Sequence, residues 1–186
     1  MTDEKPRGTA LTPAAYGASR AALWTGVSAL FTDVRGRVLL ERVDYRPHCL
    51  LPGGAVDAGE APSAAIAREV REELGLARVF PRVLALEWVP PTLPETHPAM
   101  RFPGEHLYVY EGGVLSPAEI AALVLPPQEV TGLEWARPDD LDALMVTSDA
   151  RRVRAALGAR ESGVPVVLED GCPPGRADMP GGHTDT

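Results

Sequence analysis

The sequence predicts one α/β (α+β) domain with a mixed β-sheet. Short β-branched apolar runs alternate with stretches rich in Ala, Glu, Arg and Leu, so strands and helices interleave along the chain. A hairpin pattern near the start adds antiparallel pairing to that sheet. The length of 186 residues and the 45% of hydrophobic residues suffice for one domain with a buried core, and they argue against a disordered chain.

The elements are expected in the following order. Residues 27–31 and 37–43 are apolar runs separated by Asp33-Val34-Arg35-Gly36, a pattern that predicts a β-hairpin. Residues 61–74 favour a helix that ends at Gly75, a usual C-terminal helix signal. The remaining expected elements are strands over 79–89, 106–111 and 130–136, a helix over 116–123, and one or two helices over 139–159.

The ends of the chain and one internal segment differ from this pattern. Residues 1–18 are expected to form a flexible arm, and residues 19–160 the folded domain. Residues 161–186 are expected to be a C-terminal extension, largely disordered from about 171, where Gly and Pro accumulate. The proline-rich residues 90–104 predict a loop.

Charge and composition exclude several functions. The 26 acidic and 18 basic residues give a net charge of −8, which argues against bulk binding of nucleic acid. A small anionic substrate stays compatible with this charge, because metal ions can reverse its sign locally. Two cysteines are too few for a disulfide framework, and no apolar run suits a signal peptide or a membrane span. We therefore expect a cytoplasmic protein without a membrane partner.

The segment from Gly54 to Leu76 carries the chemistry. It is a glycine-rich loop followed by a helix in which Glu69, Glu72 and Glu73 share one face, at spacings i, i+3 and i+4. Arg68 lies one turn before Glu72 and can pair with it. Hard divalent cations such as Mg²⁺ prefer oxygen ligands and could neutralise the remaining carboxylates. A solvated helix face with salt bridges is the alternative, but the glycine loop favours a site where backbone carbonyls and carboxylates converge.

This segment resembles the signature of the Nudix hydrolases, G-x5-E-x7-R-E-U-x-E-E-x-G-U, where U is an aliphatic residue. The sequence matches it at every specified position: Gly54, Glu60, Arg68, Glu69, Val70, Glu72, Glu73, Gly75 and Leu76. The resemblance implies an α/β/α sandwich and covers about residues 25–145, leaving both ends outside.

The resemblance also implies a reaction. Members of the family hydrolyse a nucleoside diphosphate linked to another group, using Mg²⁺ or alternatively Mn²⁺. Glu72 and Glu73 would be metal ligands, Glu69 a third ligand or the group that orients the water, and the carbonyl of Gly54 would complete the set. Arg68 would hold a glutamate in position, and Glu60 would support the junction of loop and helix. A metal-activated water then attacks phosphorus.

Other residues have less specific patterns. Glu129, between a turn and a strand, is the candidate for a distal catalytic carboxylate, with an exposed turn glutamate as the equal alternative; Glu87 and Glu105 are weaker candidates. Trp88 and Tyr108 could stack on a base, and Arg46 could pair with phosphate, although such residues more often serve the core or the surface.

The expected function is therefore metal-dependent cleavage of the pyrophosphate bond in a nucleoside di- or triphosphate, or in a nucleoside diphosphate linked to another group. The alternative is a nucleotide-sensing or protein-binding module of the same fold with little turnover. Decapping of RNA is disfavoured by the acidic charge and by the lack of a basic, aromatic-rich stripe. Homodimers are frequent among such enzymes, but no interface can be recognised in the sequence.

Overall fold

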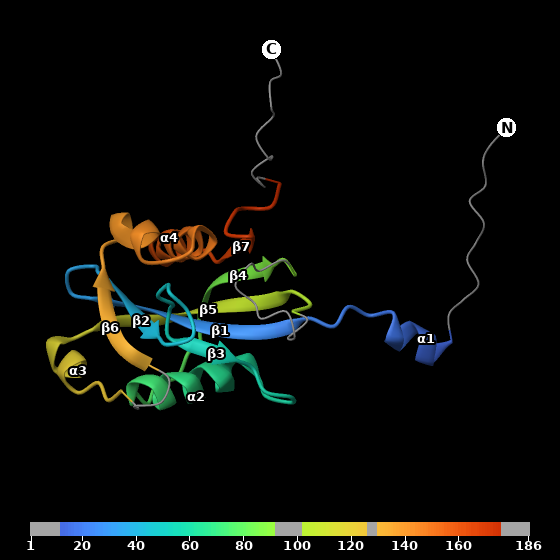
Figure 1. The fold of residues 1–186 in the computed structure, drawn as a ribbon, viewed down its shortest axis with the longest axis horizontal. Helices are drawn as coiled ribbons and strands as arrows, with labels where there is room; N and C mark the ends of the chain where they lie inside the picture. Colours follow the sequence, from blue (N-terminus) through green and yellow to red (C-terminus); the bar gives the residue numbers. More distant parts are fainter. Residues whose placement is uncertain (1–11, 92–101, 126–129, 176–186) are drawn as a thin grey trace, which may run out of the picture.

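The computed structural model describes residues 12–91, 102–125 and 130–175. Figure 1 shows a mixed β-sheet with helices on both faces, so the predicted α+β class is confirmed. The elements are α1 (Pro13–Ala18), β1 (Trp24–Asp33), β2 (Val38–Val43), β3 (Gly53–Ala55), α2 (Pro62–Leu74), β4 (Val83–Val89), β5 (Glu105–Leu115), α3 (Pro117–Ala121), β6 (Val130–Ala136), η2 (Pro138–Ala143), α4 (Thr147–Ser162) and β7 (Val166–Glu169). Within the described residues, no helix has the length and apolar character needed to cross a membrane.

The sheet has the strand order β6-β2-β1-β5-β4-β7, and β3 pairs with the first half of β1. The pairs β1–β5 and β4–β7 are parallel, while β1–β2, β1–β3, β2–β6 and β4–β5 are antiparallel. The short strand β3 thus fixes the glycine-rich loop to the middle of the sheet, directly before α2.

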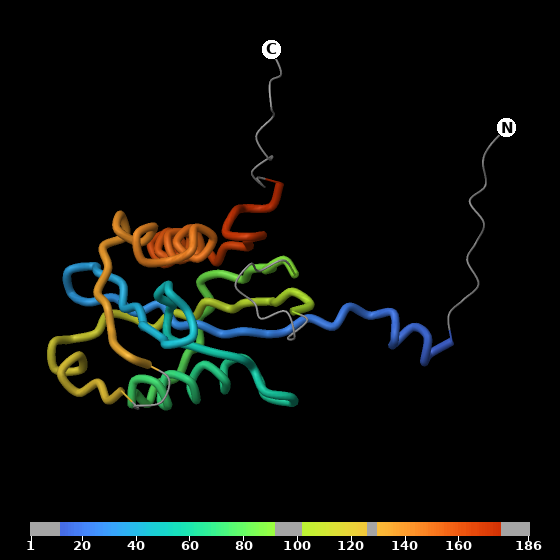
Figure 2. Tube along the Cα trace, viewed as in Figure 1, coloured from blue at the N-terminus to red at the C-terminus, as the bar shows by residue number. Residues whose placement is uncertain are grey.

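Two hydrophobic cores hold the layers together. Helix α2 covers one face through Ile66, Val70 and Leu74, the stripe that the sequence predicts, and all three are fully buried. Helix α4 covers the opposite face through Val153 and Ala156. Figures 1 and 2 show α2 and α4 on opposite sides of the strands, an α/β/α sandwich. Gly75 ends α2 in the left-handed conformation (φ 70°), as its sequence position suggests.

The strands differ from expectation in two places. The strand expected from Val79 begins only at Val83, since Pro81 has no N–H to give to a ladder and Phe80 instead turns into the core beneath α2. The strand expected over 106–111 continues to Leu115, with an irregularity opposite Leu30 and Phe31 that keeps it paired with β1.

The two ends of the chain also contain regular structure. Helix α1 lies within the segment expected to be a flexible arm; it buries none of its residues and projects from the body (Figure 1). Strand β7 lies in the expected C-terminal extension and adds a parallel neighbour to β4. Most of the proline-rich loop and the last eleven residues lie outside the described residues.

Candidate active site

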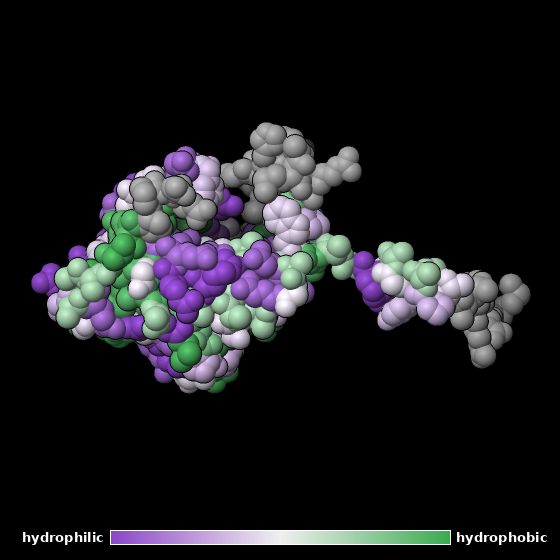
Figure 3. Space-filling model, turned by 90° about the horizontal axis from the view of Figure 1, so that it is seen from below, coloured by the Kyte–Doolittle hydropathy of each residue, from purple (hydrophilic) through white to green (hydrophobic). Residues whose placement is uncertain are grey.

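The glycine-rich loop and α2 bring the signature residues together. Pro62 stands in the first turn of α2, where its missing N–H costs nothing, and the helix runs unbroken to its glycine cap. Strand β3 holds Gly53 and Gly54 against Ser28 and Val27 of β1, beside this helix. On the face of the molecule that carries α2, Figure 3 shows a hydrophilic band across the centre.

Arg68 is the centre of an ion-pair cluster. Its Nε and Nη2 donate to the two carboxylate oxygens of Glu60 at 3.1 and 2.9 Å, a two-point contact. Its Nη1 donates to Glu69 at 2.8 Å and to Glu72 at 3.2 Å, and Nη2 also reaches the carbonyl of Ala55 at 3.1 Å. The bond with Glu60 is the main cause that raises the pKa of Arg68, and the same bond lowers the pKa of Glu60. One guanidinium therefore fixes the helix to the loop.

Glu73 and Gly54 complete the loop side of this cluster. The backbone N–H of Gly53 donates to Glu73 Oε2 at 2.8 Å, and Glu73 is 7% exposed. Gly54 faces Glu69 so closely that a Cβ there would lie 2.5 Å from Glu69 Oε1. Backbone and carboxylates thus converge at the end of β3.

Glu41 of β2 is a member of this site that sequence reasoning missed. It is 2% exposed, and its Oε1 has no hydrogen-bond partner among the described residues. Burial, followed by the charge of Glu73 and a hydrogen bond to it, raises the pKa of Glu41 to about 9. The only available signal was an acidic residue inside an otherwise apolar strand pattern.

The donor set suits a hard divalent cation. Carboxylates outnumber the one guanidinium, an unpartnered oxygen lies among them, and no side chain stands between Gly54 and Glu69. In the described part of the chain, no three His, Cys, Asp or Glu side chains already form a metal-binding group. The carboxylates accept hydrogen bonds from Arg68 and Gly53, so their side chains would have to move to bind a cation.

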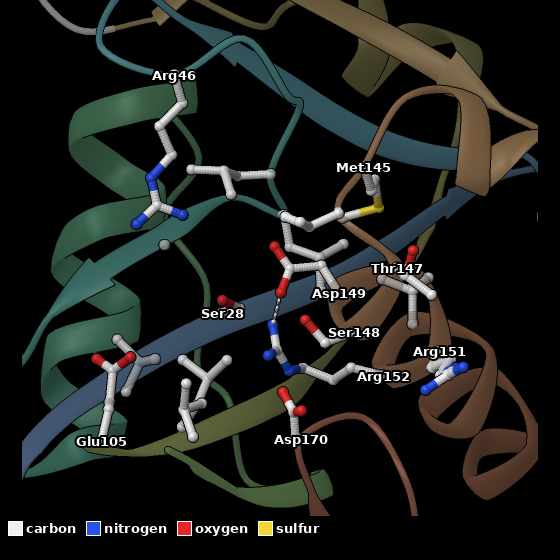
Figure 4. A pocket seen from close by; sticks show the side chains of 18 of the residues that line it. Ser28, Arg46, Glu105, Met145, Thr147, Ser148, Asp149, Arg151, Arg152 and Asp170 are labelled. Atoms are coloured by element: carbon white, nitrogen blue, oxygen red, sulfur yellow. Dashed lines mark hydrogen bonds and ion pairs between the residues drawn. The ribbon is translucent and has the colours of Figure 1, made fainter. Parts of the chain in front are cut away.

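A cavity of about 480 Å³ opens beside this cluster, lined by Gly53 and Gly54 at one side and by the first turns of α4 at the other. In Figure 4, Arg46 lies at the upper left and Glu105 at the lower left, while Asp149, Arg152 and Asp170 lie near the centre of the view. Apolar side chains such as Leu51, Leu107 and Met145 also line the cavity.

A buried ion network supports the α4 side of the cavity. Arg152 pairs with Asp149 at 2.9 Å and, through Nε, with Glu87, which is fully buried in β4. The second oxygen of Glu87 accepts from the N–H of Gly171. Asp149 and Arg152 are each 9% exposed, so the network is shielded from solvent on most sides.

Comparison with known proteins identifies the family of this chain. A family model described as the NUDIX domain matches residues 22–157. The chain belongs to the Nudix family. This membership supports the predicted enzyme class, a Nudix hydrolase. The search of curated protein sequences gave no match.

Several solved structures share the Nudix fold. The MutT NUDIX hydrolase of Burkholderia pseudomallei is 25% identical, with a TM-score of 0.53 over 74% of this chain and 98% of that one. The MutT protein of Methanosarcina mazei is 20% identical, with a TM-score of 0.57 over 76% of this chain and 95% of that one. An ADP-ribose pyrophosphatase of Streptococcus suis is 19% identical, with a TM-score of 0.54 over 80% of this chain and 99% of that one.

The structure of this Nudix protein brings most of the sequence-predicted residues together. Glu60, Arg68, Glu69 and Glu72 share the ion cluster, and Glu73 and Gly54 adjoin it. Arg46 lines the cavity. Glu129 lies outside the described residues, so its role stays a prediction.

Other candidates are placed elsewhere. Trp88 and Tyr108 are not among the described residues that line the cavity. Trp88 follows Glu87 in β4 and so points to the opposite face, and Tyr108 packs against the α2-side core, stacked on Tyr110 at 6.3 Å between ring centroids. Of the weaker base candidates, Glu87 is fully buried in the pair with Arg152.

Glu105 is the weaker base candidate that does line the cavity. Burial raises the pKa of its carboxyl, while the charges of Arg152 and Arg46 oppose that rise. Arg152, Asp149 and Asp170 line the cavity as well. They could not be recognised from the sequence, because α4 and the segment after β7 follow α2 by more than seventy residues.

Proposed function

We propose that this Nudix hydrolase cleaves the pyrophosphate bond of a nucleoside di- or triphosphate, or of a nucleoside diphosphate linked to another group, by attack of water on phosphorus. The observation that carries this proposal is the position of the carboxylate cluster: Arg68 holds it at the end of β3, where Gly54 opens onto the cavity.

We propose that Glu69, Glu72 and Glu73, with the carbonyl of Gly54, hold Mg²⁺ or alternatively Mn²⁺. When bound, such a cation lowers the pKa of water and spreads the negative charge of the phosphates. Arg68 keeps two of the three carboxylates in position, and its contact with Glu60 ties the helix to the loop. In this proposal Glu129 accepts the proton of the attacking water.

The cavity supports a nucleotide-sized ligand. Its volume lies within the range of sites for small molecules, and its mixture of apolar and polar side chains suits a base or sugar attached to phosphate. Arg46 lines the cavity and in this proposal pairs with a phosphate or with the leaving group. The name of the Streptococcus suis neighbour makes ADP-ribose a sensible first substrate to test. A cytoplasmic location and a homodimer stay predictions.

The test is formation of the nucleoside monophosphate product, separated by chromatography, from a substrate panel with Mg²⁺, comparing wild type with Glu72→Gln. We expect metal-dependent product formation by the wild type and at least a 100-fold loss of kcat in Glu72→Gln, because that variant removes a charged ligand. Glu134→Gln serves as the matched control, since Glu134 pairs with Arg42 on the far side of β2 from β1 and does not line the cavity.

Two outcomes would contradict the proposal. Unchanged turnover in Glu72→Gln would remove the cluster from the reaction. Binding of nucleotides by the wild type without hydrolysis of any of them would favour the nucleotide-sensing module instead.

A further inference from the structure

Glu41 is a buried carboxyl group outside the signature. It lies in β2, where its backbone N–H donates to the carbonyl of Leu50 at 2.8 Å and its own carbonyl accepts from Leu50 at 3.0 Å. Leu133 of β6 pairs with it from the other side. A β-bridge on one side and β6 on the other therefore fix its backbone, and the side chain is held where only 2% of the residue is exposed.

The polar neighbours of this side chain are glutamates of the proposed cation site. Glu41 is hydrogen-bonded to Glu73, and the charge of Glu69 is a further cause that raises its pKa. The ion pairs of Arg68 extend to Glu60, Glu69 and Glu72, and the N–H of Gly53 is the backbone donor to Glu73. Glu41 thus meets the glutamate that the N–H of Gly53 holds to the loop.

One oxygen of Glu41 has no partner. Oε1 is fully buried and, among the described residues, makes no hydrogen bond. An unpaired buried oxygen beside other carboxylates lowers the stability of the metal-free fold. An apolar residue at this position of an apolar strand would avoid that cost, so the carboxyl group has a different use.

We propose that Glu41 is a positioning residue of the cation site: it holds Glu73 through their hydrogen bond and offers its free oxygen to the hydration shell of the bound cation. The proposal rests on the proposed function, since it takes Glu73 as a cation ligand. Groups that hold a ligating carboxylate commonly change metal affinity 10- to 100-fold when they are removed, on the order of the effect expected here.

The test measures cation affinity rather than turnover. Mn²⁺ is titrated calorimetrically into wild type, Glu41→Leu, Glu41→Met and Glu41→Gln, and thermal unfolding is followed in EDTA and in Mn²⁺. The apolar variants should bind Mn²⁺ roughly 10- to 100-fold more weakly, while their unfolding midpoint in EDTA equals or exceeds that of wild type. Glu41→Gln keeps a side chain able to bond to Glu73, so its affinity should stay within about threefold of wild type.

The two readouts separate positioning from a structural role, because a structural role predicts a lower midpoint in EDTA. Glu134→Leu is the control, a carboxylate removed from the neighbouring strand β6, and it should leave Mn²⁺ affinity unchanged. Unaltered Mn²⁺ affinity in a folded apolar variant would overturn the proposal, and so would failure of both apolar variants to fold. A loss in Glu41→Gln as large as in Glu41→Leu would also overturn it, since the charge of Glu41 would then be what matters.

Failure of the proposed function is read from a different measurement, the absence of hydrolysis by the wild type. That result would leave the ranking of the Mn²⁺ affinities, and hence the role of Glu41, standing on its own.

Discussion

Gly54→Ala tests whether the position of the Glu69 carboxylate matters. A Cβ at residue 54 would lie 2.5 Å from Glu69 Oε1 and 2.6 Å from its Cδ, whereas ordinary contacts begin at 3.4 Å. The carboxylate must therefore retreat by about 0.9 Å. In the wild type, Glu69 Oε1 accepts a hydrogen bond from Arg68 Nη1 at 2.8 Å. If Oε1 moved straight away from Nη1 by this amount, the distance would grow to about 3.7 Å, beyond hydrogen-bonding range.

The displaced carboxylate should impair the site and spare the fold. Gly54 does not have the positive φ that side chains avoid, so alanine fits its backbone. We expect Mn²⁺ affinity and kcat to fall by about 10- to 100-fold, because displacements near 1 Å have effects of this order, and the unfolding free energy to change by less than about 1 kcal/mol. Calorimetric titration, steady-state kinetics and denaturant unfolding measure the three quantities.

Gly53→Ala is the matched control in the neighbouring residue. Gly53 has φ 145°, and a Cβ there would lie 2.1 Å from the carbonyl oxygen of Val27, a backbone atom that cannot rotate away. This variant should lose about 2 kcal/mol of stability or more. Wild-type affinity and turnover in Gly54→Ala would refute the reasoning, and so would equal destabilisation by the two substitutions.

Three further predictions concern the ion pairs. Arg68→Lys should lower Mn²⁺ affinity about tenfold, because an ammonium cannot reproduce the two-point contact with Glu60; calorimetry would show it, and an unchanged affinity would contradict it. Arg152→Met should lower the free energy of unfolding by about 3–5 kcal/mol, measured in denaturant, because it leaves the fully buried carboxyl of Glu87 without its arginine partner. The double variant with Glu87→Met should recover most of this stability. Additive losses in the double variant would refute the explanation. Hydrogen bonds from the backbone N–H and hydroxyl of the capping serine, together with an arginine, lower the pKa of Glu119 to about 2. The charged carboxylate therefore contributes stability above about pH 4.5, and this contribution is lost as the pH falls towards 2. Wild type and Glu119→Gln should differ in unfolding midpoint at pH 7 and converge near pH 2, and a constant difference would contradict this linkage.

Helix α2 could be predicted from the sequence because its determinants are local. The buried stripe is defined by apolar residues four positions apart, Ile66, Val70 and Leu74, and Gly75 defines the end of the helix. The carboxylate face follows from the same geometry, since three positions on one helix face stay together wherever the helix packs. The signature then supplied the family, because its spacing reflects this one loop and helix.

The partners of that helix could not be predicted in the same way. Glu41 is separated from Glu73 by more than thirty residues, and in the sequence it is an acidic residue within an apolar strand. Its contact exists only because β2 lies beside β1 and α2 packs across them. Strand β7 was missed for a related reason: its four residues follow a helix cap and are stabilised by pairing with β4, which periodicity within the segment does not reveal.

The distribution of charge connects these observations. The net charge of −8 argues against bulk binding of nucleic acid, yet the acidic groups are not spread evenly. On the cavity side, Arg152 pairs with both Asp149 and Glu87, so two carboxylates share one guanidinium. On the helix side, Arg68 is shared among four carboxylates, those of Asp57, Glu60, Glu69 and Glu72, and Glu73 is held next to them by the N–H of Gly53. Among the described ion pairs, carboxylates therefore outnumber guanidinium groups most strongly at the proposed cation site. Such a site would repel the proposed phosphate substrate until a cation binds, so the proposed dependence on a divalent metal would follow from the electrostatics of the fold as well as from the chemistry.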